Sequence, residues 1–278
     1  MENKKKNPVA SIILTLICIL WMYPIVLILV NSLKKEVAIT TSGVFSLPTA
    51  GTWNGVANCV ASVTQMDFLK SFWYSLVISV MSVVLIMLCC SMAAWYIVRV
   101  NGTLSKVFYY LCVFSMVVPF QMVMFTLAKT ADTLHLNKPY NICIIYLGFG
   151  AGLAVFMFTG FVKGIPLEIE EAALIDGCTP LQVYFKVLIP ILKPTIISTA
   201  ILELMWVWND YLLPTLVLDI KKYRTIPMAV QYFRGSFGHV QMGPMMASIM
   251  IDIIPIIVVY LVCQKHIIEG VVAGAVKG

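Results

Sequence analysis

Residues 71–98 read SFWYSLVISVMSVVLIMLCCSMAAWYIV, a stretch without a single charged side chain. An α-helix rises about 1.5 Å per residue, so roughly 20 apolar residues cross the ~30 Å hydrocarbon core of a bilayer. The stretch lacks the alternation of apolar and polar residues that is typical of a transmembrane β-strand. It therefore predicts a membrane-spanning helix.

The composition of the whole chain agrees with a membrane protein. Of its 278 residues, 60% are hydrophobic and only 12% are charged. Soluble domains contain about 25% charged residues, so this chain has too few to cover a soluble surface. The net charge of +6 is scattered over short loops, which excludes a nucleic-acid-binding face, and we expect no nucleic-acid partner. Most of the eight cysteines lie inside apolar runs, where we interpret them as small buried residues.

Five further apolar runs predict an all-α polytopic membrane protein, surrounded by lipid, with six transmembrane helices. We expect the first run to be retained, because it is longer than the core of a signal peptide and no A-x-A-like site follows it. Six spans place both termini on the same side, and Lys4–Lys6 before the first span favours cytoplasmic termini in the cell membrane. The predicted spans are Pro8–Val30, Ser71–Val98, Val107–Ala128, Pro139–Val162, Pro194–Leu218 and Val240–Gln264.

The link between the fourth and fifth spans, residues 163–193, reads KGIPLEIEEAALIDGCTPLQVYFKVLIPILK. Pro166 suits the first turn of a helix, and Gly177 suits the left-handed position that ends one. Thr179-Pro180 is typical of an N-cap and first position of a second helix, which Pro190 should interrupt. The link therefore predicts a helix-turn-helix on the cytoplasmic membrane surface. It is either a rigid docking element for another protein or an interfacial segment that only anchors the loop.

This link also resembles a known motif. Glu171-Ala172-Ala173, Gly177 and Val187-Leu188-Ile189-Pro190 follow the pattern EAA-x3-G-x9-I-x-L-P of ABC importer permeases, with Val187 and Ile189 as apolar departures from it. Trp208-Asn209-Asp210-Tyr211, Asn31-Ser32-Leu33-Lys34 and the C-terminal residues 264–278 resemble carbohydrate-type permeases. Over its whole length the chain is similar to the smaller permease of maltose-type sugar importers.

The resemblance implies a division of labour between subunits. A second homologous permease completes the pathway, a pair of ABC ATPase subunits binds ATP and Mg, and an extracellular solute-binding protein delivers a carbohydrate. Residues 1–70 would form the first transmembrane helix and an extracellular loop, and residues 71–278 the permease core, with a coupling loop at 163–193. The implied ATPase-coupling residues are Glu170, Glu171, Ala172, Ala173, Asp176, Gly177 and Pro190.

The chain has no G-x-x-x-x-G-K-[ST] sequence and no hydrolase or metal-site motif. We therefore expect no catalytic residue, no metal site and no cofactor on this chain, and ATP hydrolysis by a separate subunit.

Three acidic residues lie inside predicted spans, where each costs roughly 2.5–3.5 kcal/mol on insertion scales. Glu203 and Asp210 are seven residues apart, which would place both on one face of the fifth helix, with Trp206 between them and Asn209 beside them. Asp252 falls near the centre of the sixth span. Carboxylates and an amide next to indole rings suit the hydroxyls and C–H faces of a sugar, so these five residues are candidates for the substrate pathway. They could instead satisfy one another or residues of the partner permease.

Two further features of the spans bear on packing and function. Gly148, Gly150 and Gly152 would allow a close approach of helices, or a local break, in the fourth span. Pro119 is expected to kink the third span, and Gln121 just after it is a weaker pathway candidate. The main alternative function is a proton-coupled secondary transporter that uses the three acids as a relay. A carrier of that kind does not need the structured link between the fourth and fifth spans.

Overall fold

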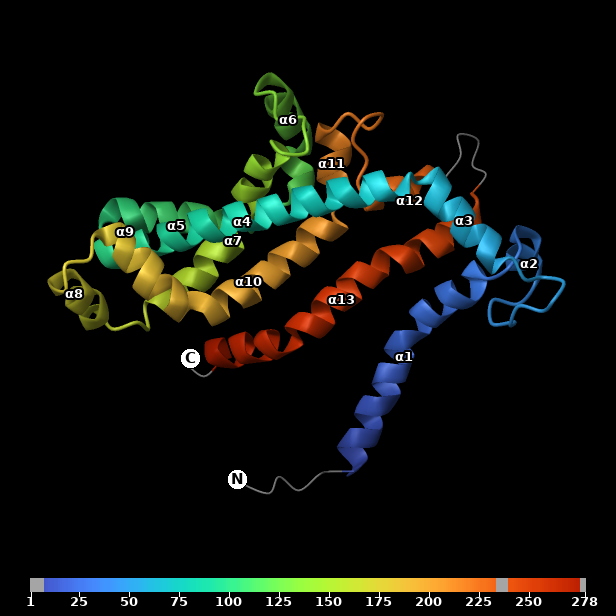
Figure 1. The fold of residues 1–278 in the computed structure, drawn as a ribbon, viewed down its shortest axis with the longest axis horizontal. Helices are drawn as coiled ribbons and strands as arrows, with labels where there is room; N and C mark the ends of the chain where they lie inside the picture. Colours follow the sequence, from blue (N-terminus) through green and yellow to red (C-terminus); the bar gives the residue numbers. More distant parts are fainter. Residues whose placement is uncertain (1–7, 234–239, 276–278) are drawn as a thin grey trace. The chain divides into compact units, whose positions relative to one another are not determined.

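The computed structural model describes residues 8–233 and 240–275. All the secondary-structure elements in these ranges are helices (Figure 1). Lys4–Lys6 and Val276–Gly278, which carried part of the orientation and resemblance arguments, lie outside the described residues. The elements are α1 (Pro8–Ser32), α2 (Glu36–Thr41), α3 (Gly55–Gln65), α4 (Phe68–Val100), α5 (Thr103–Ser115), α6 (Phe120–Thr133), α7 (Ile142–Val162), α8 (Leu167–Ile175), α9 (Pro180–Gln182), the π-helix η1 (Val183–Leu188), α10 (Ile189–Asn209), α11 (Leu212–Val217), α12 (Ile226–Val230), the 3₁₀-helix η2 (Gln231–Phe233) and α13 (Met242–Ala275).

Among the described residues, five helices are long and apolar enough to cross a membrane, and a sixth span results if the bent pair α5 and α6 counts as one. The five are Pro8–Ser32, Phe68–Val100, Ile142–Val162, Pro180–Asn209 and Met242–Gln264. The prediction of a largely helical membrane protein is confirmed.

The third predicted span is not one continuous helix. It is split into α5 and α6, whose axes differ by 106°. Pro119, in an extended conformation, is the N-cap residue of α6. Proline lacks an N–H group and its ring clashes with the preceding helical turn. The chain therefore turns sharply where we expected only a kink.

The bounds predicted for the fifth span, Pro194–Leu218, were wrong at both ends. Pro190 does not interrupt the helix, because the chain passes through the π-helix η1 and Pro190 lies in the first turn of α10, where a missing N–H costs least. The continuous span therefore starts at Pro180. At the other end α10 stops at Asn209, and Asp210 has an extended backbone with φ −73° and ψ 122°. Glu203 and Asp210 consequently do not share a helix face.

The chain divides into two compact units. Unit 1 contains Met1–Leu69 and Ala229–Pro255, and unit 2 contains Lys70–Met228 and Ile256–Gly278. In unit 1, both carboxylate oxygens of Glu36 accept hydrogen bonds from the start of α13, at 2.9 Å from the Met242 nitrogen and 3.1 Å from the Gly243 nitrogen. A carboxylate at this position satisfies two free N–H groups and lies at the positive end of the helix dipole.

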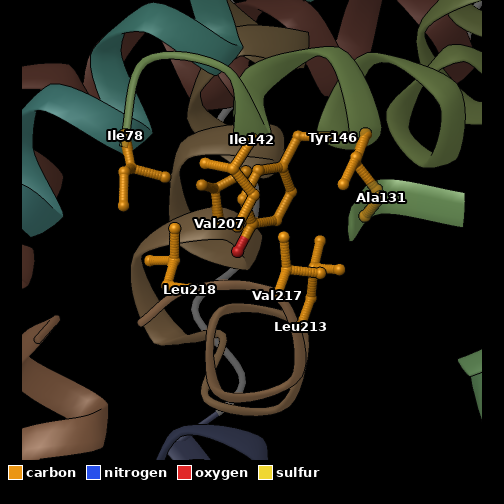
Figure 2. Packing of buried hydrophobic residues seen from close by; sticks show 9 residues of the cluster. Ile78, Ala131, Ile142, Tyr146, Val207, Leu213, Val217 and Leu218 are labelled. Carbon is orange, nitrogen blue, oxygen red and sulfur yellow. The ribbon is translucent and has the colours of Figure 1, made fainter. Parts of the chain in front are cut away.

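One core cluster of unit 2 packs aliphatic side chains from α4, α6, α7, α10 and α11 around one tyrosine. Tyr146 on α7 is fully buried among them, with its ring next to Ile142 and Val207 (Figure 2). A buried tyrosine hydroxyl needs a hydrogen-bond partner. The partner is Asp210, described below.

Close packing in unit 2 depends on two of the three glycines that we singled out on α7. A Cβ atom on Gly150 would lie 2.7 Å from Cδ1 of Ile86 and 2.9 Å from Oε2 of Glu203. A Cβ atom on Gly152 would lie 2.4 Å from Cγ of Met116. Gly148 has open space around it. The expected close helix approach is therefore confirmed at Gly150 and Gly152, but not at Gly148.

Candidate functional site

The link 163–193 is ordered by local hydrogen bonds at the turn between α8 and α9. Gly177 has φ +86°, the left-handed conformation that glycine adopts at no steric cost. The Gly177 N–H donates to the Leu174 carbonyl and the Cys178 N–H donates to the Ala173 carbonyl, each at 3.0 Å. This double pattern is the Schellman motif that ends many helices.

The second helical segment starts with the N-cap that the sequence predicted. The Thr179 N–H donates to Oε1 of Gln182 at 2.8 Å, and the Gln182 N–H donates to Oγ1 of Thr179 at 3.4 Å. This reciprocal pair is a capping box. Hydrogen bonds between residues close in the sequence therefore fix both sides of the turn.

One side of the link is tied to the end of α4 by a buried carboxylate. Glu170 is 5% exposed, and its Oε1 accepts from Nε and Nη2 of Arg99 at 2.8 and 2.6 Å. Its Oε2 accepts from Nε1 of Trp95 at 2.8 Å. Arg99 also donates to the Ile165 carbonyl at 3.0 Å. Such charge-assisted bonds with near-complete burial make a rigid connection.

The other side of the link is tied to the same helix. The hydroxyl of Tyr184, on η1, lies 2.7 Å from Oγ of Ser91. Its ring packs against Trp95 with centroids 5.7 Å apart. The link is therefore joined to α4 around Trp95 on both sides of its tip, through α8 and through η1.

The tip of the link is exposed and partly apolar. Ile175, the last residue of α8, is 86% exposed and Leu174 is about half exposed. Figure 1 shows α8 at one end of unit 2, far from α11. Contiguous exposed apolar surface often marks an interaction site, and these two exposed residues are neighbours. Of the residues that the resemblance implied for coupling, the exposed ones are Glu171, Ala172, Asp176, Gly177 and Pro190, whereas Ala173 is half-buried and Glu170 faces inward.

Glu203 lies inside unit 2 and has one oxygen without a partner. Its side chain is 2% exposed, and Oε1 has no hydrogen-bond partner among the described residues. Its Oε2 lies against Gly150, as the space around that glycine shows. Glu203 is therefore enclosed by α4, α7 and α10 and does not line an open surface.

Asp210 is held by three hydrogen bonds. Its Oδ2 accepts from the Tyr146 hydroxyl at 2.9 Å. Its Oδ1 accepts from the N–H groups of Leu212 and Leu213 at 2.9 and 3.4 Å, which caps the short helix α11. This capping explains why α10 ends before Asp210, because aspartate favours a helix start over a helix interior.

A cavity of about 240 Å³ lies beside Asp210, at the junction of α6, α7, α10 and α11. Its aromatic lining residues are Phe120, Phe149 and Trp206, and its polar ones are Gln121 and Asp210. The structure thus brings two of the five predicted pathway residues, Trp206 and Asp210, together with the weaker candidate Gln121.

The remaining pathway candidates lie elsewhere. Glu203 is enclosed, as described above. Asn209 is exposed, and its amide donates to the Met205 carbonyl at 2.7 Å, within its own helix. Asp252 is partly buried on the part of α13 that belongs to unit 1. The five candidates therefore do not form one cluster within unit 2.

Sequence reasoning missed most residues that shape these two sites. Trp95 lies within the second predicted span and Arg99 directly follows it, and neither position indicated a contact with the link. Tyr146, Phe120 and Phe149 lie in apolar runs that give no signal of a cavity. Among the described residues, no group of three or more His, Cys, Asp or Glu side chains is placed to hold a metal ion.

Membrane-capable helices and a structured link with an exposed tip define a helical membrane protein. Comparison with known proteins identifies the family to which it belongs. Residues 86–272 match the family "Binding-protein-dependent transport system inner membrane component". The chain belongs to this family and is a permease subunit of an ABC importer, not its catalytic subunit.

Relatives of known name cover nearly the whole chain. A probable starch degradation products transport system permease of Thermoanaerobacterium thermosulfurigenes is 36% identical over 93% of both chains. A multiple sugar-binding transport system permease of Streptococcus mutans is 34% identical, covering 96% of this chain and 95% of that one. A solved bacterial ABC transporter that imports the acidic polysaccharide alginate has the same fold in one chain, with a TM-score of 0.77 and 22% identity over 95% of this chain and 99% of that chain.

Proposed function

We propose that this chain is a subunit through which a sugar or oligosaccharide crosses the cell membrane, driven by ATP hydrolysis on separate partner subunits. The named relatives transport starch degradation products and multiple sugars, which supports a carbohydrate substrate. The observation that carries the proposal is the link 163–193, whose exposed tip is rigidly fixed to α4. A docking element must pass the movement of its partner on to the membrane helices, and the bonds to α4 suit this link to that role.

In this proposal the exposed residues of the link dock into one of a pair of ATPase subunits that bind ATP and Mg. Glu171, Ala172, Asp176 and Gly177 form the docking face, with Pro190 nearer the membrane. Glu170 has a different role from the one that the sequence suggested: it holds the link to Arg99. Closure of the ATPase pair then moves α4 and α10 together.

The proposal also sets the orientation and the other partners. The link 163–193 and both termini face the cytoplasm, and the cavity beside Asp210 faces outward. A second, homologous permease completes the pathway, and an extracellular binding protein supplies the sugar. Trp206, Asn209 and Asp210 are pathway residues at or near this cavity, Asp252 is a pathway residue on α13, and Glu203 is enclosed between helices of unit 2.

Purification and reconstitution of the native complex test this function. The tagged chain should co-purify with a second permease and an ATPase of the Walker-A type, and proteoliposomes should accumulate sugar only with ATP and the binding protein. Ala172→Arg at the tip should abolish ATPase association. The control is Lys106→Ala, a change on α5 outside the link, which should leave ATPase association intact. A homo-oligomer without an ATPase would contradict the proposal.

The proton-coupled alternative rests on the enclosed carboxyl group of Glu203. Family membership does not favour it. In an ATP-driven importer, uptake persists when a protonophore collapses the proton gradient, and Glu203→Gln, which keeps the shape of the side chain, retains uptake, since ATP-driven transport needs no titratable group at this position. Uptake that stops in both experiments would restore the alternative.

A further inference from the structure

The cavity beside Asp210 has a specific chemistry. Three aromatic rings line it, those of Phe120, Phe149 and Trp206. Phe120 and Phe149 contact each other edge to face at 5.4 Å, and Trp206 contacts Tyr146, which does not line the cavity, edge to face at 5.5 Å. Such contacts hold each ring in one orientation. The aromatic surfaces are therefore fixed before any ligand enters.

The carboxylate in the cavity is fixed as well. A carboxylate has about four acceptor positions. Asp210 uses three of them for the Tyr146 hydroxyl and the two N–H groups of α11. One acceptor position on Oδ2 remains, on a group that cannot rotate without losing these bonds. Gln121, at the exposed start of α6, adds an amide that both donates and accepts.

The charge that lines the cavity is negative. Asp210 is its one charged lining residue in the part of the chain that the structure describes, and the other lining residues are aromatic, aliphatic or amide. A bound anion would have no cation to neutralise it and would lie beside a carboxylate, which is unfavourable in a partly dry site. A hydroxyl donor has no such penalty.

We infer that this subunit itself holds one uncharged sugar ring of the transported carbohydrate, with a ring hydroxyl donating to Asp210, an amide contact to Gln121 and the C–H face of the ring against Trp206. The inference rests on the proposed function and adds the ligand class. The volume of about 240 Å³ is just below the ~300–1,000 Å³ of sites that enclose a drug-sized ligand, so it suits one ring of an oligosaccharide and not the whole chain.

Thiol protection tests occupancy directly. Gln121→Cys places a thiol at the rim of the cavity, and Met122→Cys places one on the next residue, which is 76% exposed and does not line the cavity. The intact complex is treated with a membrane-impermeant thiol reagent in the presence of maltotriose, raffinose or the acidic trisaccharide trimannuronate, each added at high concentration without binding protein. The complex with Gln121 unchanged measures the background from native cysteines.

We expect at least one of the two uncharged sugars to slow modification at Gln121→Cys about tenfold when the sugar is about tenfold above its Kd. Modification of Met122→Cys should not change, and trimannuronate should protect neither. Protection of both positions, of neither, or protection by trimannuronate equal to that by the uncharged sugars would overturn the inference.

Transport gives a second, independent measurement. Trp206→Ala should lower the maximal uptake rate of the reconstituted importer about tenfold and raise the ATP hydrolysed per sugar moved, as loss of an aromatic anchor does. Trp206→Phe should recover most of the rate, and Trp73→Ala, which removes another exposed tryptophan outside the cavity, should leave uptake unchanged. Equal uptake by Trp206→Ala and Trp73→Ala would overturn the inference. If wild type moves no sugar with ATP, the proposed function fails; if it does but these variants behave alike, only the sugar site fails.

Discussion

Arg99 and Glu170 form an ion pair with 2.6 Å between Nη2 and Oε1, although 71 positions separate them in the sequence. Their side chains are only 19% and 6% exposed. The pair joins the end of α4 to α8, which carries the exposed tip of the link. It is a mechanical connection between a membrane helix and a surface loop.

Removal of one partner should leave a buried charge unpaired. Glu170→Ala is expected to cost about 3–5 kcal/mol of stability, because Arg99 loses its carboxylate partner and keeps only the Ile165 carbonyl, and the Trp95 N–H loses its acceptor. Thermal unfolding of the purified complex measures this loss. Glu168→Ala, two residues earlier on the exposed side of α8, is the control and should stay within about 0.5 kcal/mol of wild type. Equal stability of the two variants would show that the ion pair is not a fixed connection.

Gly177 should be sensitive to backbone conformation and not to size. A Cβ atom there meets nothing within 4 Å, but φ +86° is strained for a branched residue by about 1–3 kcal/mol. We expect Gly177→Val to uncouple ATP hydrolysis from sugar uptake, whereas Gly177→Asn, which tolerates this conformation, keeps them coupled. Gly160→Val is the control, because that helical glycine also has open space around it. Full coupled transport by Gly177→Val would argue against the proposed role of the turn.

The hydroxyl of Tyr146 should stabilise the junction of α7, α10 and α11. Tyr146→Phe removes a hydrogen bond to a charged carboxylate, which is worth about 1.5–3 kcal/mol. The midpoint of thermal unfolding should fall, and uptake should decrease because Asp210 is less well held. Tyr96→Phe removes the hydroxyl of an exposed tyrosine on α4 and should change neither measurement.

Two glycines of the same helix offer a matched test of packing. Gly150→Ala forces a Cβ atom into Ile86 and Glu203, and overpacking of this kind costs about 1–3 kcal/mol. Gly148→Ala, half a turn away and with open space around it, should be neutral or slightly stabilising, since alanine favours helices over glycine. Thermal unfolding of the two variants side by side checks this. A similar midpoint for both would mean that α7 and α10 adjust without strain.

Most of the helices could be predicted from hydropathy because a bilayer leaves the backbone few alternatives to a helix. The turn at Gly177 and the N-cap at Thr179 were predictable for a related reason: their hydrogen bonds close over three to five residues. The ends of the third and fifth spans were not. At Pro119 and Asp210, two outcomes were compatible with the same apolar run, and the outcome at Asp210 depends partly on Tyr146, which is 64 positions away.

The residues of the candidate site, too, could be predicted only in part from the sequence. The tip of the link could be found from its motif, whereas the ion pair that holds it depends on a contact between remote segments. The cavity could be anticipated only at Trp206, Asp210 and Gln121, since its other aromatic residues are indistinguishable by sequence from side chains that face lipid. Glu203 was expected on a pathway surface, and the structure instead encloses it.

The bonds from Glu36 to the first residues of α13 have a consequence for biogenesis. Glu36 leaves the ribosome long before its partners, which follow 206 and 207 positions later. At a synthesis rate of ~5–20 residues per second, this acceptor waits about 10–40 s for its donors. Unit 1 therefore cannot be completed before residue 243 has been made, and its early segments must stay in a state that still admits the last helix. A chain truncated before α13 would leave the Glu36 carboxylate without these two donors.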